Sequence, residues 1–468
     1  MDNNSILIKP GIIPILDKDF IPAVLWNHAF LKEVHSSGEG ITFTIGLERN
    51  DGISSVISTQ IFPQEHKMSS ENFFYVDQLI KTLLWIWGGH RLTLAGSDQI
   101  IQYIKKIYSL QGKHSFDVKF MSKIYEKPFT IVEVNDKEKI ISKEKSIPMG
   151  GHIKGCRIGF DLGASDRKVS AVIDGKVVFS EEVPWNPGEQ DDPEYHYHEI
   201  MTMLRRAAQH LPRVDSIGGS SAGVYINNRV MAASLFRSIP PCLFEKRIKN
   251  IFIDIQREWN VPLKVINDGE VTALAGSMSL QANAVLGIAL GSSEAGGYVD
   301  RKGNITTQLN ELAFVPIDFN KKAPVDSWSQ DSGCGVQCLS QIAVIRLAEK
   351  QGIIFQENQT PAEKLTHIQE LLAEGDQKAF QVFETIGIYL GYAIAYYADF
   401  YDLEHVLILG RVTSGQGGHI ILEQASQVLR EEFKELYDKI SLHLPDESNR
   451  RVGQSIAAAS LPLISSEK

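Results

Sequence analysis

The hydrophobic positions of the chain follow two repeats in alternation, one typical of strands and one typical of helices. Strand-like runs are found at 41–48, 53–62, 156–162, 169–179, 214–217, 261–266, 284–290, 298–300 and 405–409. Runs with helical spacing are found at 75–87, 99–109, 194–210, 243–258, 271–280, 341–350, 361–374, 376–398 and 420–436. Strands that alternate with helices and end in glycine-rich turns indicate an α/β fold that binds ligands at the strand ends.

The N-terminal third of the chain has a pattern of its own. Three prolines predict that residues 1–35 are irregular, because proline interrupts a long helix. The next segment, 40–110, reads as strand, Asp-Gly turn, strand and two helices, which faintly repeats a hairpin pattern found later in the chain. We therefore predict a separate N-terminal α/β domain over 1–150, of unknown role, with a decayed duplication as one hypothesis for its origin.

Composition narrows the class of protein. A chain of 468 residues suggests roughly two to four domains, and 43% hydrophobic with 22% charged residues is ordinary for a globular protein. The net charge of −10 argues against a nucleic-acid partner or an anionic membrane surface. The four cysteines are too few for a disulfide scaffold and we recognise no signal peptide, so we expect a cytoplasmic protein. The most apolar long run, 385–398, is too short to span a bilayer and reads as a buried helix.

A polar turn after the strand at 156–162 is the first candidate for chemistry. Asp161, Gly163 and Ser165 stand in it, and Asp174-Gly175 predicts a two-residue hairpin further on. Glycine lets backbone N–H groups approach a phosphate closely, and an aspartate can hold a divalent cation beside it. A hairpin with a polar turn explains the same residues, so this turn alone leaves both interpretations open.

Three further loops follow at the ends of predicted strands. They are Asn267-Asp268, Gly291 to Gly297, and Gly410 to Gly418. Phosphoryl transfer needs a metal-holding carboxylate, backbone donors for the phosphates, a base for the attacking hydroxyl and a nucleoside pocket. The four loops, in this order, could supply each of these parts.

Taken together, the four loops resemble those of the ROK family of sugar kinases and sugar-responsive repressors, within the actin/hexokinase-like ATPase superfamily. The resemblance covers roughly 155–465 and implies two lobes, 151–280 and 281–468, that close over a substrate. In that family an Asp-x-Gly-Gly-Thr turn binds metal and phosphate, and Asp161 with the turn that follows it looks like the counterpart. The whole chain is similar to a long subgroup with an extra N-terminal domain.

The resemblance implies roles for individual residues. Asp268 would be the general base, Asn267 and Glu311 would contact the sugar, and Asp161 would act on Mg²⁺ directly or through a bound water. Residues that would bind ATP and its phosphates are Gly163, Ala164, Ser165, Gly291, Ser292, Ser293, Gly410 and Arg411. Glu294 would be an unusual acid beside the γ-phosphate. The structural alternative for Asp268 is that it caps a helix beginning near Val271.

Two segments depart from the family's pattern. Phe314 stands where the family has a histidine that serves a zinc site, and the segment with Cys334 and Cys338 lacks the other ligands. Two thiolates without two further ligands do not make a structural zinc site. We therefore expect no zinc and interpret both cysteines as small buried residues. The sugar pocket has also lost part of its usual hydrogen-bonding set, so the resemblance does not specify which sugar binds.

The first functional hypothesis is an ATP- and Mg²⁺-dependent kinase that phosphorylates a hydroxyl of a sugar or related polyol. The rival is a catalytically silent protein that senses a sugar or nucleotide with the same cleft. Intact Asp161 and Asp268 favour the enzyme, whereas Phe314, the cysteine segment and Glu294 favour the rival. A scaffold role for the N-terminal domain is a third hypothesis. No compact basic helical pair precedes residue 150, so we expect no nucleic-acid partner, and a homodimer stays open.

Overall fold

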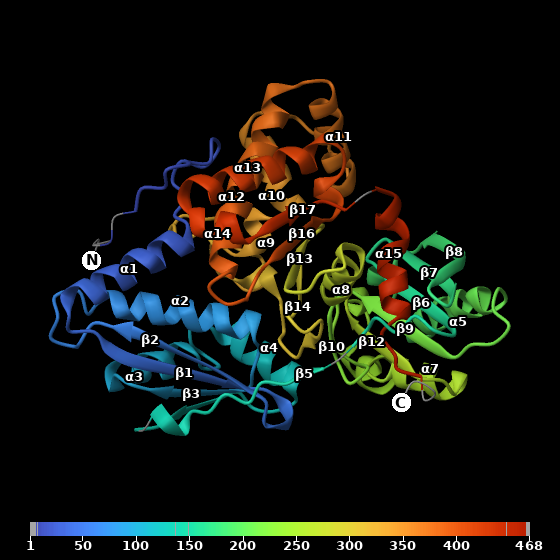
Figure 1. Cartoon of the computed structure of the whole chain (residues 1–468), viewed down its shortest axis with the longest axis horizontal. Helices are drawn as coiled ribbons and strands as arrows, with labels where there is room; N and C mark the ends of the chain where they lie inside the picture. The colour runs from blue at the N-terminus through green and yellow to red at the C-terminus, as the bar shows by residue number, and fades with distance from the viewer. Residues whose placement is uncertain (1–5, 7, 136, 148, 446, 465–468) are drawn as a thin grey trace.

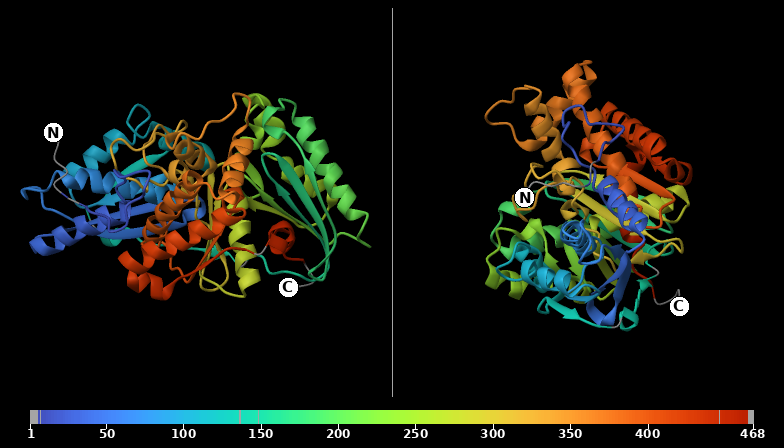
Figure 2. Two further views of the ribbon diagram at one scale, coloured as in Figure 1. Left: turned by 90° about the horizontal axis from the view of Figure 1, so that it is seen from above. Right: turned by 90° about the vertical axis from the view of Figure 1, so that its left-hand side faces the viewer.

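Three sheets organise the chain, one in an N-terminal domain and one in each of two lobes (Figure 1). The structure is a computed structural model that describes residues 6, 8–135, 137–147, 149–445 and 447–464. The N-terminal domain and the first lobe lie at opposite ends of the molecule, with the second lobe between them (Figure 2, left). In the described part of the chain, no helix combines the length and the apolar character needed to cross a bilayer.

The N-terminal sheet has four strands in the order β2-β1-β3-β4. Its strands are β1 (Ile41–Glu48), β2 (Ser54–Ile61), β3 (Arg91–Ala95) and β4 (Thr130–Glu133), and its helices are α1 (Ala23–Ser37), α2 (Glu71–Ile86), α3 (Asp98–Ile107) and α4 (Ser115–Tyr125). The sequence analysis did not predict β3, β4 or α4. The central strand β1 is antiparallel to both neighbours, whereas the central strand of the first lobe has one parallel neighbour, so topology gives no support to a decayed duplication.

The prediction that residues 1–35 are irregular holds for 8–22, which contain no helix or strand, but was wrong from Ala23 onwards. Helix α1 begins directly after Pro22, which occupies the N-cap position, and continues to Ser37. A proline at the start of a helix removes no intrahelical hydrogen bond, because the first N–H groups have no partner within the helix. The prolines therefore set where the helix begins and do not prevent it.

The first lobe has a five-stranded sheet in the order β12-β9-β6-β7-β8. Its strands are β6 (Cys156–Leu162), β7 (Asp166–Ile173), β8 (Lys176–Pro184), β9 (Ser216–Ser221) and β12 (Leu263–Asn267), with a separate hairpin β10 (Val224–Ile226) and β11 (Arg229–Ala232), and its longer helices are α5 (Pro193–Ala208) and α7 (Ile251–Trp259). Strands β6, β9 and β12 run parallel, so their carboxyl ends meet at one edge. The predicted hairpin turn is present, with Asp174 and Gly175 at φ 48° and 78° between β7 and β8.

The second lobe has a six-stranded sheet in the order β17-β16-β13-β14-β15-β5. Its strands are β5 (Ser146–Ile147), β13 (Val285–Leu290), β14 (Glu294–Val299), β15 (Ile305–Thr306), β16 (His405–Leu409) and β17 (Ser441–His443). Its helices are α9 (Gly335–Cys338), α10 (Gln341–Lys350), α11 (Pro361–Ala373), α12 (Gln377–Tyr397), α13 (Gln416–Glu432) and α14 (Lys434–Lys439). Helix α8 (Asp268–Leu280) connects the lobes and packs on β13 and β14.

The C-terminal helix α15 (Glu447–Ala459) returns to the first lobe and packs on β6 and β9 (Figure 1). A Cβ added at Gly159 would lie 1.8 Å from the carbonyl oxygen of Ser455, and one at Gly218 would lie 1.7 Å from that of Ala458. These glycines let the helix backbone touch the sheet. The boundary predicted at 281–468 therefore needs a correction, because the last helix belongs to the first lobe.

The N-terminal domain is built into the second lobe and does not stand apart. One continuous hydrophobic core joins residues of both, from Phe30 and Trp85 to Tyr389 and Ile408. The first lobe has its own core around Phe160 and Phe252. The N-terminal domain reaches the first lobe through Glu126, which pairs with Arg229 and, at 2.9 Å, with Lys249. The N-terminal domain therefore shares a hydrophobic core with the second lobe and contacts the first lobe through ion pairs.

Candidate active site

Asp161 lies at the carboxyl end of β6, where the parallel strands of the first lobe meet. It pairs in register with Ser220 of β9, whose hydroxyl donates a 2.6 Å hydrogen bond to the Asp161 carboxylate. Burial raises the pKa of Asp161 to about 6, and the nearby charge of Asp268 adds to the rise although the Ser220 bond opposes it. The predicted strand ended at 217, but β9 continues through Ser221 because small residues also fit a buried central strand.

Asp268 is the first residue of helix α8, next to the end of β12. The N-cap of this helix is Asn267, whose side-chain oxygen accepts a 2.7 Å bond from the Gly269 N–H. Asn267, and not Asp268, therefore caps helix α8. Asn267 also donates a 2.8 Å bond to the carbonyl of Gly223, which leaves one amide N–H for a substrate.

Four carboxyl groups near this edge, those of Asp161, Asp268, Glu270 and Glu311, influence one another's charge. Burial raises the pKa of Glu311 to about 7 and also raises that of Asp268, and the Asp268 charge adds to the rise at Glu311. Glu270, which follows on α8, has a pKa raised by burial to about 8, with Glu311 adding to it and Lys264 opposing it. A carboxylate with a raised pKa is a stronger base, as proton abstraction from a hydroxyl requires.

The two predicted phosphate turns are closed by their own backbone. Gly163 donates a 2.9 Å bond to the carbonyl of Asp166, and Gly291 donates one of 2.9 Å to the carbonyl of Ser293. The indole of Trp185 fixes the first turn by a 2.8 Å bond to the Gly163 carbonyl. Within the described residues, the N–H groups at the tips of the turns donate to no other backbone group; these are Ala164, Ser165, Ser292 and Ser293.

The fourth loop lies beside the third and reaches across to the first. Gly410 has φ 102°, and a Cβ there would lie 2.3 Å from the carbonyl of Leu290, so only glycine lets this loop pass the end of β13. Arg411 donates a 2.9 Å bond to the Ser165 hydroxyl and pairs with Asp166 at 3.1 Å. The structure therefore brings a guanidinium, which favours phosphate groups, next to the Asp161 turn.

Glu294 does not lie where the sequence analysis placed it. It is the first residue of β14, 2% exposed, and its carboxyl accepts a 2.9 Å bond from the hydroxyl of Tyr397 on α12. Its other oxygen packs against Gly335 and has no hydrogen-bond partner among the described residues. Burial raises its pKa to about 8, which favours the neutral form at pH 7. The predicted position of Glu294 beside a γ-phosphate is therefore corrected: the acid is an internal group of the second lobe.

A buried acid of this kind makes stability depend on pH. The folded-state pKa of Glu294 exceeds its ordinary value of 4.5, so its contribution is complete below pH 4.5 and is lost as pH rises toward 8. The loss is at most about 1.4 kcal/mol per pH unit. We expect Glu294→Gln to flatten the fall in unfolding free energy between pH 5 and 7.5, measured by urea titration. The exposed control Glu357→Gln should keep the wild-type slope, and an unchanged slope in Glu294→Gln would show that the carboxyl is ionised.

The cysteine segment is buried as expected. Burial raises the pKa of the Cys334 thiol to about 12 and raises that of Cys338, so both remain protonated. Cys334 and Cys338 are both free cysteines. Phe314 lies in an aromatic cluster with Trp85 of the N-terminal domain.

Sequence reasoning missed three residues that build the site. Ser220 holds Asp161, and Glu270 adds a fourth carboxyl. Gln454 of α15 lies within hydrogen-bonding distance of the Ser220 hydroxyl at 3.3 Å, of Thr272 at 3.4 Å and of the Asp268 carbonyl at 3.5 Å. Of these three residues, only Glu270 lies beside a motif that the sequence analysis had recognised, Asn267-Asp268, so only Glu270 could have been found from its neighbours in the sequence.

Comparisons with known proteins identify solved structures that share this fold. No protein-family model and no curated protein matches the chain. A ROK family glucokinase from Streptomyces griseus, solved with glucose and AMPPNP, matches with TM-score 0.51 at 19% identity over 66% of this chain and 99% of that one. A ROK family transcriptional regulator, a homolog of the E. coli MLC protein, matches with TM-score 0.54 at 19% identity over 65% and 77%. A ROK hexokinase from Thermus thermophilus gives 0.50 at 17% over 65% and 98%.

About two thirds of the chain has the fold of these ROK structures. This confirms the predicted actin/hexokinase-like architecture, and the ROK fold of the glucokinase is matched over almost its full length. About a third of this chain lies outside the match, since 66% is covered. At these identities the likeness concerns the fold, and both kinases and a regulator share it.

The residues present fit a magnesium nucleotide at the edge between the lobes. Asp161 offers a buried carboxylate oxygen, which is a ligand type that Mg²⁺ accepts directly or through water. The turns at 163–165 and 291–293 offer backbone N–H groups, and Arg411 offers positive charge. A Cβ at Gly415 would meet no atom within 4 Å, so the glycine loop before α13 borders open space.

Proposed function

We propose that this protein is an ATP- and Mg²⁺-dependent kinase that phosphorylates a hydroxyl group of a sugar or related polyol. The observation that carries the proposal is the meeting of Asp161, Asp268 and Glu311 at the strand edge that two phosphate turns also border. A carboxylate for the metal, a base and a polar substrate contact are the parts that phosphoryl transfer requires.

In this proposal each group of the chain has one task. Mg²⁺ bound with ATP would neutralise charge on the transferred phosphoryl group. Asp161, held by Ser220, would orient that metal, and the turns at 163–165 and 291–293 would bind the phosphates. Asn267 and Glu311 would hold the sugar, and Asp268 would accept the proton of its attacking hydroxyl. Arg411 would bind the nucleotide phosphates from the second lobe.

The rival hypothesis is a protein that senses a sugar or nucleotide without catalysis. The match to a transcriptional regulator is consistent with this hypothesis. One of the observations that favoured the rival is removed, because Glu294 is buried inside the second lobe. The carboxyls of the cleft favour the enzyme, since a sensor needs no base.

ADP formation across a panel of hexoses, N-acetylhexosamines and polyols tests the proposal. We expect at least one acceptor to produce ADP from Mg·ATP in a coupled assay, and none to do so without magnesium. A sugar that raises the melting temperature without ADP formation from any member of the panel would favour the sensor.

A further inference from the structure

The backbone around Glu311 is hydrogen-bonded to the N-terminal domain. The N–H of Asn310 donates to the carbonyl of Ile86, and that of Glu311 donates to the carbonyl of Trp85, both at 2.9 Å. These two carbonyls belong to the last turn of α2, where a helix leaves its C=O groups without intrahelical partners. The segment that carries Glu311 therefore completes the end of a helix from another domain.

Aromatic packing also holds the same segment. Phe314 stacks on Trp85 of α2 with ring centroids 4.2 Å apart and an interplanar angle of 28°. Phe116 and Phe120 of α4 lie 5.7 and 6.5 Å from the same ring. Such ring pairs add stabilisation beyond the area that they bury. The phenylalanine three residues after Glu311 is thus anchored in the N-terminal domain.

A buried ion-pair network fixes α2 and α4 to the loop before the cysteines. The ammonium of Lys81, whose side chain is 2% exposed, lies 2.7 Å from one oxygen of Asp117 and also pairs with Asp331. The indole of Trp85 donates to Asp117 at 3.2 Å, which links the network to the aromatic cluster. Asp331 alone comes from the second lobe, so this lysine joins the two parts of the molecule.

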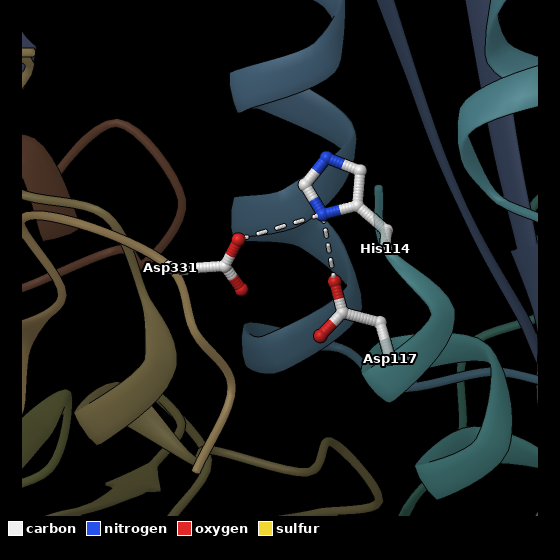
Figure 3. A group of neighbouring side chains, drawn as sticks. All are labelled: His114, Asp117 and Asp331. Carbon is white, nitrogen blue, oxygen red and sulfur yellow. Dashed lines mark ion pairs between the residues drawn. The ribbon is translucent and has the colours of Figure 1, made fainter. Parts of the chain in front are cut away.

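His114 completes the network. Its Nε2 lies 2.7 Å from Asp77. Its Nδ1 lies 3.3 Å from Asp117 and 3.8 Å from Asp331 (Figure 3). His114, Asp117 and Asp331 could offer a metal three ligand atoms within 4.8 Å of one another. The Lys81 ammonium, however, already bonds both carboxylates, so a metal ion would have to displace a buried positive charge. We therefore interpret the group as an ion-pair network.

We propose that helix α2, fixed to the second lobe through Lys81 and Asp331, is the element that positions Glu311 near Asp268. The N-terminal domain is then part of the substrate site, although it contributes no group to the chemistry. Helix α2 contacts the Glu311 loop through the backbone of Asn310 and Glu311 and through the ring of Phe314. It contacts the loop before the cysteines through Asp331. The role of Glu311 toward sugar rests on the proposed function, whereas the anchoring itself does not.

Amide hydrogen exchange of the full chain tests the anchoring without any ligand. We expect Lys81→Met to accelerate exchange in the peptide spanning 308–315 at least about tenfold. The reason is that the two hydrogen bonds from this peptide to Trp85 and Ile86 of α2 should open more often. A peptide from β6 should exchange as in the wild type. The control Lys105→Met removes a 2.7 Å pair with Glu133 inside the N-terminal domain and should leave the 308–315 peptide unchanged.

Unchanged exchange of 308–315 in folded Lys81→Met would overturn the proposal. If this variant does not fold, Asp331→Asn keeps the Lys81–Asp117 pair and should accelerate the same peptide to a smaller extent; no acceleration would again overturn it. With an acceptor sugar from the panel, KM for the sugar should rise in the variant while KM for ATP stays constant. Equal changes in KM for the sugar and KM for ATP would mean that the helix has only a structural role. If the protein has no kinase activity, the hydrogen-exchange experiment still tests the anchoring of the 308–315 segment.

Discussion

Asp268→Asn is expected to lower kcat by about 10² to 10⁴, the usual effect of losing a general base. The substitution keeps the size of the side chain and removes its ability to accept a proton at neutral pH. Helix α8 should keep its start, because its N-cap is Asn267. We therefore expect the melting temperature to stay near that of the wild type, so that the loss is one of turnover and not of folded protein.

Steady-state kinetics with Mg·ATP and the best acceptor sugar provide the measurement. Asp376→Asn is a suitable control, because Asp376 caps helix α12 and accepts a 2.8 Å bond from Ala379. Asparagine also caps helices, so this control should keep both stability and kcat. A normal kcat in Asp268→Asn would mean that another group, such as Glu270 or Glu311, accepts the proton.

Asp161→Ala is expected to remove most of the magnesium-dependent part of nucleotide binding. A ligand at a hundredfold excess over its Kd stabilises a folded protein by about 2.7 kcal/mol, and this stabilisation should need magnesium in the wild type. In the variant, ATP should stabilise the protein weakly and to nearly the same extent with and without magnesium, through the loops of the second lobe. The Ser220 hydroxyl loses its acceptor, so each melting temperature is compared with that of the same variant without ligand.

Asp191→Ala provides the matched control for this variant, because it removes an exposed carboxylate from the same lobe. It should keep the full magnesium-dependent shift. A shift that survives unchanged in Asp161→Ala would leave nucleotide binding in place but assign the metal to another group.

Local signals in the sequence predicted the parts of the site that depend on neighbours in the chain. The Asp174-Gly175 turn, the end of β12 at Asn267 and the turn after Asp161 were all found, because small residues at strand ends leave a clear pattern. The resemblance of the four loops to those of the ROK family then implied the two-lobed architecture. Helix bounds such as 361–374 came within a few residues of the structure, which has Pro361–Ala373.

Long-range contacts explain what the sequence did not predict. Ser220 bonds Asp161 across 59 positions, and Gln454 reaches Ser220 across 234. Glu294 was misplaced because β14 begins at this residue, four positions before the predicted strand at 298–300, so the side chain belongs to a buried strand and not to a loop. Helix α1 was missed because proline was interpreted as a breaker and not as a start. The anchoring of Glu311 by α2 joins segments more than 200 positions apart, for which no local pattern exists.

Transfer of the labelled γ-phosphate of ATP to an acceptor sugar tests the central claim most directly. Wild-type protein with magnesium should convert the best acceptor of the panel to a labelled sugar phosphate, with one ADP formed per phosphate transferred. Asp268→Asn at equal concentration should form the same product far more slowly, by the factor stated above. Label that appears only as inorganic phosphate, or no transfer to any sugar under conditions where Mg·ATP binds, would contradict the assignment of this cleft as a sugar kinase site.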